Sequence, residues 1–383
     1  MINDIEEAKY GVKLSLYADD SATWKSGSNV AAITKDVQHY LDQLKKFFDR
    51  WGFKLSTDKT VAIIFTRNKK CRLDDIKLNG NIIKIEKKVR FLGVIFDREM
   101  TWVPRVDYVV ARCSKRLNLM KVMAEARWGA SKSILLIVYK ALIRSVIDYG
   151  CIVYDSASDT VKARLDVIQA KALRICCGAM VGTPTSAVQV ECGQPPLVLR
   201  RLRMASDYAV KIKSIPEHPT ASTIDDCWQN HYGDFPACRE PFGVKVTKTL
   251  KAAHVTDVPP APTSAAPWTH PSKTVLTSYL RPLRVKVRTH ITDLWQDTWD
   301  YNDTGQFCRD LYPLVSYKLK HHTHPRSKDV QITRLRFGHV QLREQLYLIG
   351  QRTDPNCPTC NQPEDVEHYF HPSIFISSIM AKQ

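Results

Sequence analysis

The sequence predicts an α+β protein in which a layer of short strands and one helix precedes a longer, all-helical part. Before residue 102, short alternating or β-branched runs are separated by turn residues and surround one long amphipathic stretch. Beyond it, apolar positions recur every three or four residues, which is typical of helices. The expected parts are a mixed layer at 1–102, helices at 103–215, a proline-rich linker at 216–272, a helical tail at 273–350 and a cysteine-containing tail at 351–383.

The stretch VKLSLYADDSATW, residues 12–24, predicts a β-hairpin. Apolar and polar side chains alternate up to Tyr17, the carboxylates Asp19 and Asp20 follow, and a second short run ends at Trp24. Two carboxylates this close repel each other, so a fold keeps them together only with cations nearby, and hard oxygen ligands suit Mg²⁺. By residue type alone, a plain acidic hairpin tip is the simpler interpretation.

The next element is an amphipathic helix from Val30 to Trp51. Its apolar positions fall at steps of three and four, so they form one stripe along the helix. Ser28 or Asn29 suits the N-cap, and Gly52 ends the helix. We expect the stripe to pack as core on the back of the hairpin.

Three short runs at 61–65, 82–85 and 89–96 predict further strands. They are rich in β-branched or aromatic residues and are broken by Asn79-Gly80 and Gly93. Asn-Gly is a strong signal for a tight hairpin turn. With the first hairpin, these strands are expected to complete one sheet covered by the helix.

The all-helical part predicts helices at about 105–126, 131–149 and 159–177. Between Arg105 and Arg144 there are nine basic residues and two acidic ones, Asp107 and Glu125. A single basic helix is usually a solvated face, whereas a surplus over two successive helices suits contact with a phosphate backbone. The nine are Arg105, Arg112, Lys115, Arg116, Lys121, Arg127, Lys132, Lys140 and Arg144.

The range 216–272 predicts a linker with some local structure. It holds nine prolines and few periodic apolar positions, so burial cannot offset the entropy lost on ordering. Helical periodicity returns from Leu276, with Trp295 and Trp299 on an apolar stripe, and a further short helix is expected to end at Leu348.

The charge balance favours a polyanionic partner. Lys and Arg number 56 against 39 Asp and Glu, a formal charge of +17, which suits nucleic acid or an acidic membrane surface. No run reaches the roughly 18 apolar residues of a spanning helix, and residues 1–9 carry acidic side chains where a signal peptide is basic. We therefore expect an intracellular protein, nuclear or cytoplasmic, whose eleven cysteines are mostly reduced and buried.

Three sequence blocks carry a resemblance to a known family. They are YADD at 17–20 after a hydrophobic strand, GFKLS at 52–56 with Lys59-Thr60, and RFLGV at 90–94. YADD alone is a weak four-letter match, but three blocks in this order are specific. Together they resemble the reverse transcriptases of non-LTR retrotransposons, the jockey-like group of LINE elements in particular. Further similarity at 128–130, 148–150 and 183–184 extends the resemblance over residues 8 to 215.

The resemblance implies that 1–102 is part of a polymerase palm and that 103–215 is the thumb, which holds the template and primer. In such polymerases two Mg²⁺ ions stabilise the attacking and the leaving oxygens. The match assigns Asp19 and Asp20 as magnesium ligands and catalytic residues. It makes Lys59 a candidate general acid for the leaving pyrophosphate, and an exposed loop lysine is the alternative.

Phe91, Leu92 and Gly93 correspond in the resemblance to the primer grip, a β-hairpin that presses on the primer backbone. Gly93 permits a close backbone approach. Phe91 and Leu92 are equally well explained as core residues.

Several parts of the family's pattern are not matched. The upstream aspartate and the fingers should precede the hairpin, Asp4 lies too close to it to be that aspartate, and no RNase H domain is visible at 268–295. We expect a fragment of an RNA-directed DNA polymerase that does not polymerise alone. The intact family uses dNTPs, an RNA template and an RNA/DNA or DNA primer duplex. The alternatives are a nucleic-acid-binding remnant without catalysis and a chain that never folds stably.

The tail predicts a zinc knuckle. Cys357 and Cys360 form a C-x2-C pair, and His368 and His371 follow, so two thiolates and two imidazoles stand at zinc-ligand spacing. The retroelement knuckle that this tail resembles has a cysteine where Ser373 stands. Zinc is thus the second expected metal, and a decayed knuckle that binds none is the alternative.

Overall fold

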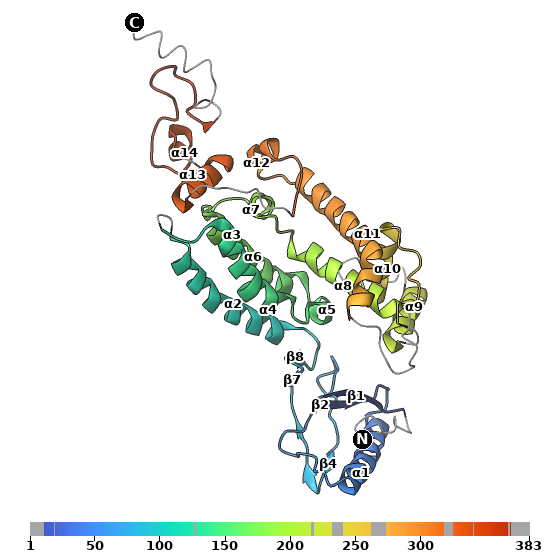
Figure 1. Cartoon of the computed structure of the whole chain (residues 1–383). Coiled ribbons are helices and arrows are strands. Elements are labelled where there is room, and N and C mark those ends of the chain that lie inside the picture. Colours follow the sequence, from blue (N-terminus) through green and yellow to red (C-terminus); the bar gives the residue numbers. More distant parts are fainter. Residues whose placement is uncertain are drawn as a thin grey trace. The chain divides into compact units, whose positions relative to one another are not determined.

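The computed structural model describes residues 11–18, 20–125, 128–215, 218–231, 240–261, 273–317, 325–339, 341–366 and 368. The chain divides into two units between Asp107 and Tyr108, close to the predicted boundary at 102. All strands in the described part of the chain lie in the first unit, and the second is built from helices (Figure 1). The α+β class is therefore confirmed, with most of the described chain helical. No helix within the described ranges is long and apolar enough to cross a membrane.

The predicted hairpin opens the first unit. β1 (Lys13–Tyr17) pairs antiparallel with β2 (Asp20–Trp24), in a register that places Tyr17 opposite Asp20. Ala18 in the connecting turn has a left-handed φ of 53°. Asp20 is therefore the first residue of the returning strand, at the tip of the hairpin.

Helix α1 (Val30–Arg50) confirms the predicted amphipathic helix. The Oδ1 atom of Asn29 accepts a hydrogen bond from the backbone N of Ala32 at 3.1 Å and caps the helix. The Gln38 side chain makes two hydrogen bonds to the backbone of Lys77 in β4 (Lys77–Leu78). It accepts from the backbone N at 2.7 Å and donates to the backbone O at 2.9 Å. The core of this unit comprises Val12, Tyr40, Leu41, Leu44, Ile76, Leu78 and Ile83.

The expected single sheet is not formed, because no described strand pairs with more than one partner. Besides the first hairpin there are three further two-stranded ladders. Two are closed by their own tight turns: Asn79-Gly80 and Leu92-Gly93 all have positive φ, so each strand pairs locally. The ladders are β3 (Val61–Ala62) with β6 (Lys84–Ile85), β4 (Lys77–Leu78) with β5 (Asn81–Ile82), and β7 (Lys88–Phe91) with β8 (Val94–Asp97).

The first helices of the second unit follow the sequence prediction with one difference. α2 (Val103–Met123), which spans the unit boundary, and α6 (Asp159–Cys177) are continuous helices. The stretch predicted as one helix at 131–149 is instead α3 (Lys132–Val138), a π-helical segment η2 (Tyr139–Arg144) and α4 (Ser145–Asp148). The chain continues through α5 (Cys151–Tyr154), α7 (Thr185–Glu191) and α8 (Leu197–Lys213).

The range expected to be a proline-rich linker holds two helices, α9 (Pro219–His231) and α10 (Phe242–Ala252). Both pack against α8, and Val246 and Leu250 of α10 are buried. The described part of 216–272 therefore differs from the expectation. Prolines such as Pro219 and Pro241 stand at or just before helix starts, where their fixed φ and missing N–H are tolerated.

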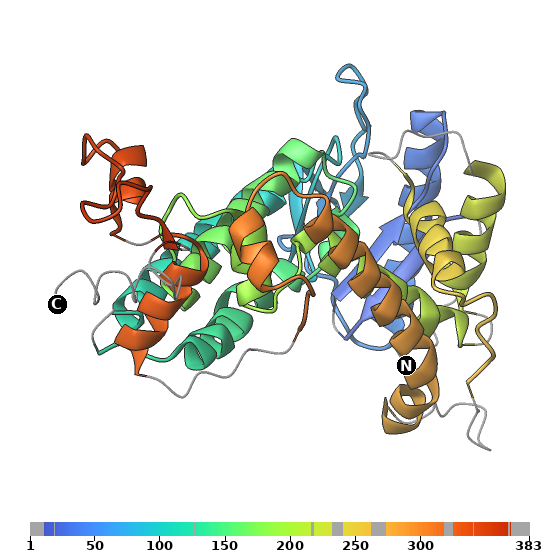
Figure 2. The same ribbon diagram turned by 90° about the horizontal axis from the view of Figure 1, so that it is seen from above.

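The rest of the chain adds four helices to the second unit. α11 (Lys273–Asp300) runs along α8 (Figures 1 and 2). It buries Ile291 and the predicted stripe residues Trp295 and Trp299. The shorter helices are α12 (Gln306–Leu311), α13 (Arg326–Arg336) and α14 (Arg343–Leu348).

Helix α13 is docked on the end of α6. The buried Arg326 donates to the carbonyls of Cys176 at 2.5 Å and Ile175 at 2.8 Å, and Arg334 donates to the carbonyl of Gly178 at 3.0 Å. These carbonyls end a helix and have no partner within it, so the two arginines satisfy them. Residues 326–336 are thus part of the helical body.

Candidate nucleic-acid and metal sites

The acidic hairpin supplies one described carboxylate. Asp20 is exposed at the start of β2, while Asp19 lies outside the described residues. No group of three acidic or metal-ligating side chains surrounds Asp20 within the described ranges. One carboxylate is less than a two-metal site requires, so the described residues do not by themselves fit a complete magnesium centre.

The other palm-type residues have different surroundings. Lys59 is an exposed residue of a short turn in which the N of Thr60 donates to the O of Thr57 at 3.1 Å. Phe91, Leu92 and Gly93 form the end of the β7–β8 hairpin and are half-buried. These three residues therefore lie at the turn of a two-stranded hairpin.

Two of the nine basic residues are buried and bonded to protein. Arg105 donates from Nη1 to the carbonyl of Gly93 at 3.0 Å, so it braces the tip of the β7–β8 hairpin. The Nζ atom of Lys132 lies 2.6 Å from Oε1 of the buried Glu191, which also pairs with Arg336 at 3.2 Å. Buried side chains with these partners are not accessible to a phosphate, and we exclude both from the proposed binding surface.

Helix α2 carries the exposed basic residues Arg112, Lys115 and Lys121. Between Asp107 and the end of the helix there is no acidic residue to balance them. Arg116 is half-buried and donates to the carbonyl of Leu142. Arg127 lies outside the described residues.

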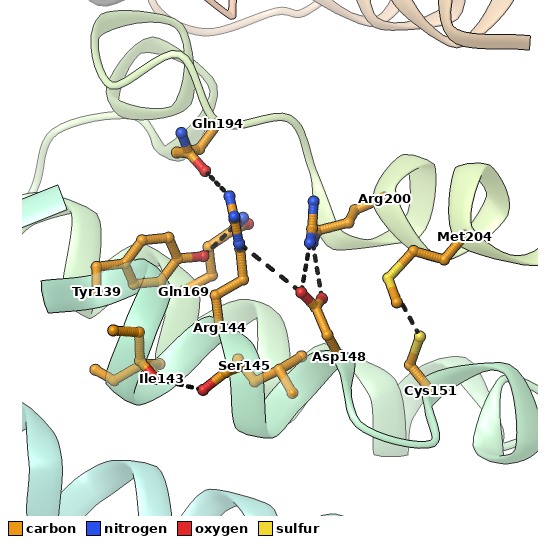
Figure 3. Close-up of polar contacts among 12 residues, drawn as sticks. Tyr139, Ile143, Arg144, Ser145, Asp148, Cys151, Gln169, Gln194, Arg200 and Met204 are labelled. Atoms are coloured by element: carbon orange, nitrogen blue, oxygen red, sulfur yellow. Dashed lines mark hydrogen bonds and ion pairs between the residues drawn. The ribbon is translucent and has the colours of Figure 1, made fainter. Parts of the chain in front are cut away.

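Lys140 and Arg144 both lie on the π-helical segment. Arg144 is part of an ion network with Asp148 and Arg200 (Figure 3). The guanidinium of Arg200 on α8 binds both oxygens of Asp148, with Nε 2.7 Å from Oδ1. Arg144 reaches the same carboxylate at 3.8 Å and donates to Oε1 of Gln194 at 2.8 Å. Arg200 is 52 positions from Asp148, so no local signal in the sequence connects them.

The cysteine tail brings together three of the four predicted zinc ligands. Ligand atoms of Cys357, Cys360 and His368 all lie within 4.8 Å of one another, and Sγ of Cys360 is 3.5 Å from Nε2 of His368. His371 lies outside the described residues. Two thiols and an imidazole at this separation fit tetrahedral zinc with one position left for a further ligand.

The electrostatics of this group favour a thiolate. A hydrogen bond from the backbone of Thr359 lowers the pKa of Cys357 to about 7, with smaller contributions from His368 and Cys360. The backbone N of Cys357 donates to the O of Gln362 at 2.7 Å and closes the small loop. A thiolate held by backbone donors is the form that binds metal.

Comparison with known proteins identifies the lineage. The RNA-directed DNA polymerase from mobile element jockey of Drosophila melanogaster is 23% identical over 205 residues, which cover 54% of this chain and 22% of that protein. The Retrovirus-related Pol polyprotein from type-1 retrotransposable element R1 4 of Nasonia vitripennis is 20% identical over 371 residues, 92% of this chain and 81% of that protein. This chain is a distant homologue of non-LTR retrotransposon reverse transcriptases.

Homology to these reverse transcriptases confirms the resemblance carried by the three sequence blocks. The chain spans only about a fifth of the length of the jockey proteins that it matches. No protein-family model matches the chain, and no solved structure matches it significantly.

Proposed function

We propose that this relative of retrotransposon reverse transcriptases binds RNA, or an RNA/DNA or DNA duplex, through its helical unit. One observation carries the proposal: after Asp107, α2 exposes Arg112, Lys115 and Lys121 and has no acidic residue. Uncompensated cations on a helix face are the usual contacts to a phosphate backbone. The half-buried Arg116, Lys140 and Arg144 extend the same basic character.

In this proposal the residues up to 102 derive from a polymerase palm and 103–215 from the thumb. Asp19 and Asp20 would hold Mg²⁺, Lys59 would face the triphosphate, and Phe91, Leu92 and Gly93 would form the primer grip. Mg²⁺ would supply charge stabilisation for nucleotidyl transfer from dNTPs. The ions of a two-metal site need carboxylates from two separate strands, and the matched blocks supply only the Asp19–Asp20 pair, so we expect the chain alone not to polymerise.

Nucleic-acid binding is tested by anisotropy of a labelled RNA/DNA hybrid titrated with the full chain at several salt concentrations. Binding should weaken steeply with salt. Replacing Arg112, Lys115 and Lys121 by Met together should reduce the slope of log K against log salt by up to about three, one for each phosphate contact. A salt-independent affinity, or a triple variant that binds like the wild type, would refute the proposal.

Catalysis is tested separately by primer extension with dNTPs and Mg²⁺. We expect no incorporation, and unchanged hybrid binding in the Asp20→Ala variant, since Asp20 is remote in sequence from the basic helices. Incorporation that Asp19→Ala abolishes would show that the chain is a complete polymerase and would contradict the proposed lack of catalysis.

A further inference from the structure

Two arginines on the second unit share one carboxylate, and a lysine lies near them. Arg144 and Arg200 both bind Asp148, which is their common acidic partner (Figure 3). Lys140 lies four positions before Arg144 on the same π-helical segment and is half-buried. Three positive side chains therefore lie around one negative charge, and Asp148 holds two of them, Arg144 and Arg200, in place.

Lys140 and Arg144 lie four positions apart on the π-helical segment. Side chains at this spacing point to nearly the same side, as they do on an α-helix. Two side chains of α2 contact the backbone carbonyls of the π-helical segment. Arg116 donates to the carbonyl of Leu142, and Sγ of Cys113 lies 3.8 Å from the carbonyl of Ile143. Segments of this rare type are frequent at functional sites.

The cluster has donors to spare. Lys140 makes no hydrogen bond or ion pair within the described part of the chain. In Arg144, Nη1 donates to Gln194, and the buried Nε makes no hydrogen bond but lies 3.8 Å from Oδ2 of Asp148. The side chains of Arg144 and Arg200 remain 21% and 18% exposed, so the site is open to solvent. A group with several acceptor oxygens and negative charge would match these donors.

We propose that Lys140, Arg144 and Arg200 form a clamp for one backbone phosphate of the bound nucleic acid. This inference rests on the proposed function and adds Arg200, with Asp148 and Gln194 as positioning residues that orient the two guanidiniums. The clamp differs from the exposed cations of α2 because Arg144 and Arg200 are fixed by partners before the ligand arrives, so these two side chains lose little entropy on binding.

The electrostatic environment agrees with this geometry. Partial burial lowers the pKa of Lys140, and the positive charges of Arg144 and Arg200 lower it further. The ammonium group is thus destabilised by its neighbours while the site is empty. An anion bound between the three cations would relieve that repulsion.

The test is the salt dependence of binding between the full chain and a labelled RNA/DNA hybrid. Lys140→Met should reduce the slope of log K against log salt by about one. It should weaken binding roughly five- to tenfold near 0.1 M salt, as expected for the loss of one phosphate contact. Lys140→Arg should retain most of the slope. The matched control is Lys171→Met on α6, an exposed lysine in the same unit, which should bind like the wild type.

A measurement on the wild type avoids any effect of the variant on folding. Amine-reactive labelling followed by mass spectrometry should show that the hybrid protects Lys140 but not Lys171. The clamp would be overturned if the wild type bound with the expected salt dependence but Lys140→Met kept the same slope of log K against log salt. It would also be overturned if the bound hybrid left Lys140 of the wild type unprotected. Either result would leave the proposed function standing. No binding by the wild type would refute both.

Phosphatidylserine vesicles provide a second arm, because a lipid headgroup offers similar oxygens. We expect Lys140→Met to change hybrid binding and not vesicle binding. An effect of this variant on vesicles alone would reject the nucleic acid as the ligand of the clamp.

Discussion

Asp155 illustrates how single carboxylates hold this helical unit together. It accepts from Nε of Arg201 at 2.8 Å and from Nζ of Lys245 at 2.5 Å, and so joins α5, α8 and α10. Burial raises the pKa of Asp155, but the charges and hydrogen bonds of Lys245 and Arg201 outweigh burial and leave the pKa below its ordinary value. The ionised form is therefore the one that stabilises the fold.

Asp155→Asn should lower the free energy of unfolding by about 2 to 3 kcal/mol, near the lower end for breaking a buried pair because Lys245 is a quarter exposed. The pKa of Asp155 is lower in the folded than in the unfolded chain. The difference in free energy of unfolding between wild type and variant should therefore be constant above the unfolded pKa of about 3.9. It should shrink as the pH falls through the folded pKa. Urea unfolding at several pH values measures both.

Asp226→Asn is the control for this prediction, because Asp226 is exposed on α9. It should change stability by less than about 0.5 kcal/mol. Equal losses in the two variants would show that Asp155 contributes no more than a surface carboxylate.

A single substitution at Cys360 tests whether the group of Cys357, Cys360 and His368 binds zinc. The wild-type chain should bind about one zinc ion, and Cys360→Ser should retain less than half of it, since one of two thiolates is lost. Metal analysis of the full chain after dialysis measures this, with Cys71→Ser, a cysteine outside the group, as the control. A wild type without zinc would favour the decayed knuckle.

Among elements, the junction of α6 and α13 depends on one glycine. Gly178 ends α6 with φ +72°, and an added Cβ would lie 2.5 Å from Cγ2 of Val330 on α13. Gly178→Ala should therefore destabilise the fold by about 2 kcal/mol or more, of which roughly 1 to 2 kcal/mol is the left-handed backbone penalty. Chemical denaturation measures the change.

The double variant with Val330→Ala separates the two causes, because it removes the two methyl carbons nearest to the added Cβ, leaves Cβ of residue 330 at 3.1 Å, and keeps the backbone penalty. The loss of unfolding free energy in the double variant should thus be smaller than the sum of the losses in the two single variants. Gly182→Ala in the neighbouring turn should be harmless, since nothing lies within 4 Å of its added Cβ. Strict additivity would argue against the close contact between α6 and α13.

For the whole molecule, the docking of α13 predicts where the chain tolerates truncation. Ending the chain after 325 removes Arg326, Asp329 and Val330, all buried, and leaves helix-end carbonyls of α6 without partners. Ending it after 339 removes α14, which buries no residue fully. We expect the first truncation to lower the thermal midpoint of helical circular dichroism by several degrees more than the second. Equal midpoints would mean that α13 is dispensable.

Much of the element pattern was predictable from local signals. The hairpin at 12–24, the helix with its Asn29 cap and the turn at Asn79-Gly80 are all specified by neighbours in the sequence, through alternation, capping and left-handed turn residues. The family blocks and the cysteine spacing were likewise visible. Two expectations differ from the structure for one reason: the single sheet and a linker with only some local structure both depended on how segments pack with distant partners.

The sequence alone determined the α+β class, the basic character of the helical part, the zinc-ligand spacing and the relation to reverse transcriptases. Each of these depends only on residue types and on their order over short distances in the chain. Only the tertiary structure decided which basic residues face solvent. It buries Arg105 against Gly93 and Lys132 against Glu191, and it brings Arg200 across 52 positions to Asp148 beside Arg144. Burial and charge pairing depend on contacts between residues far apart in the chain, and no local pattern records them.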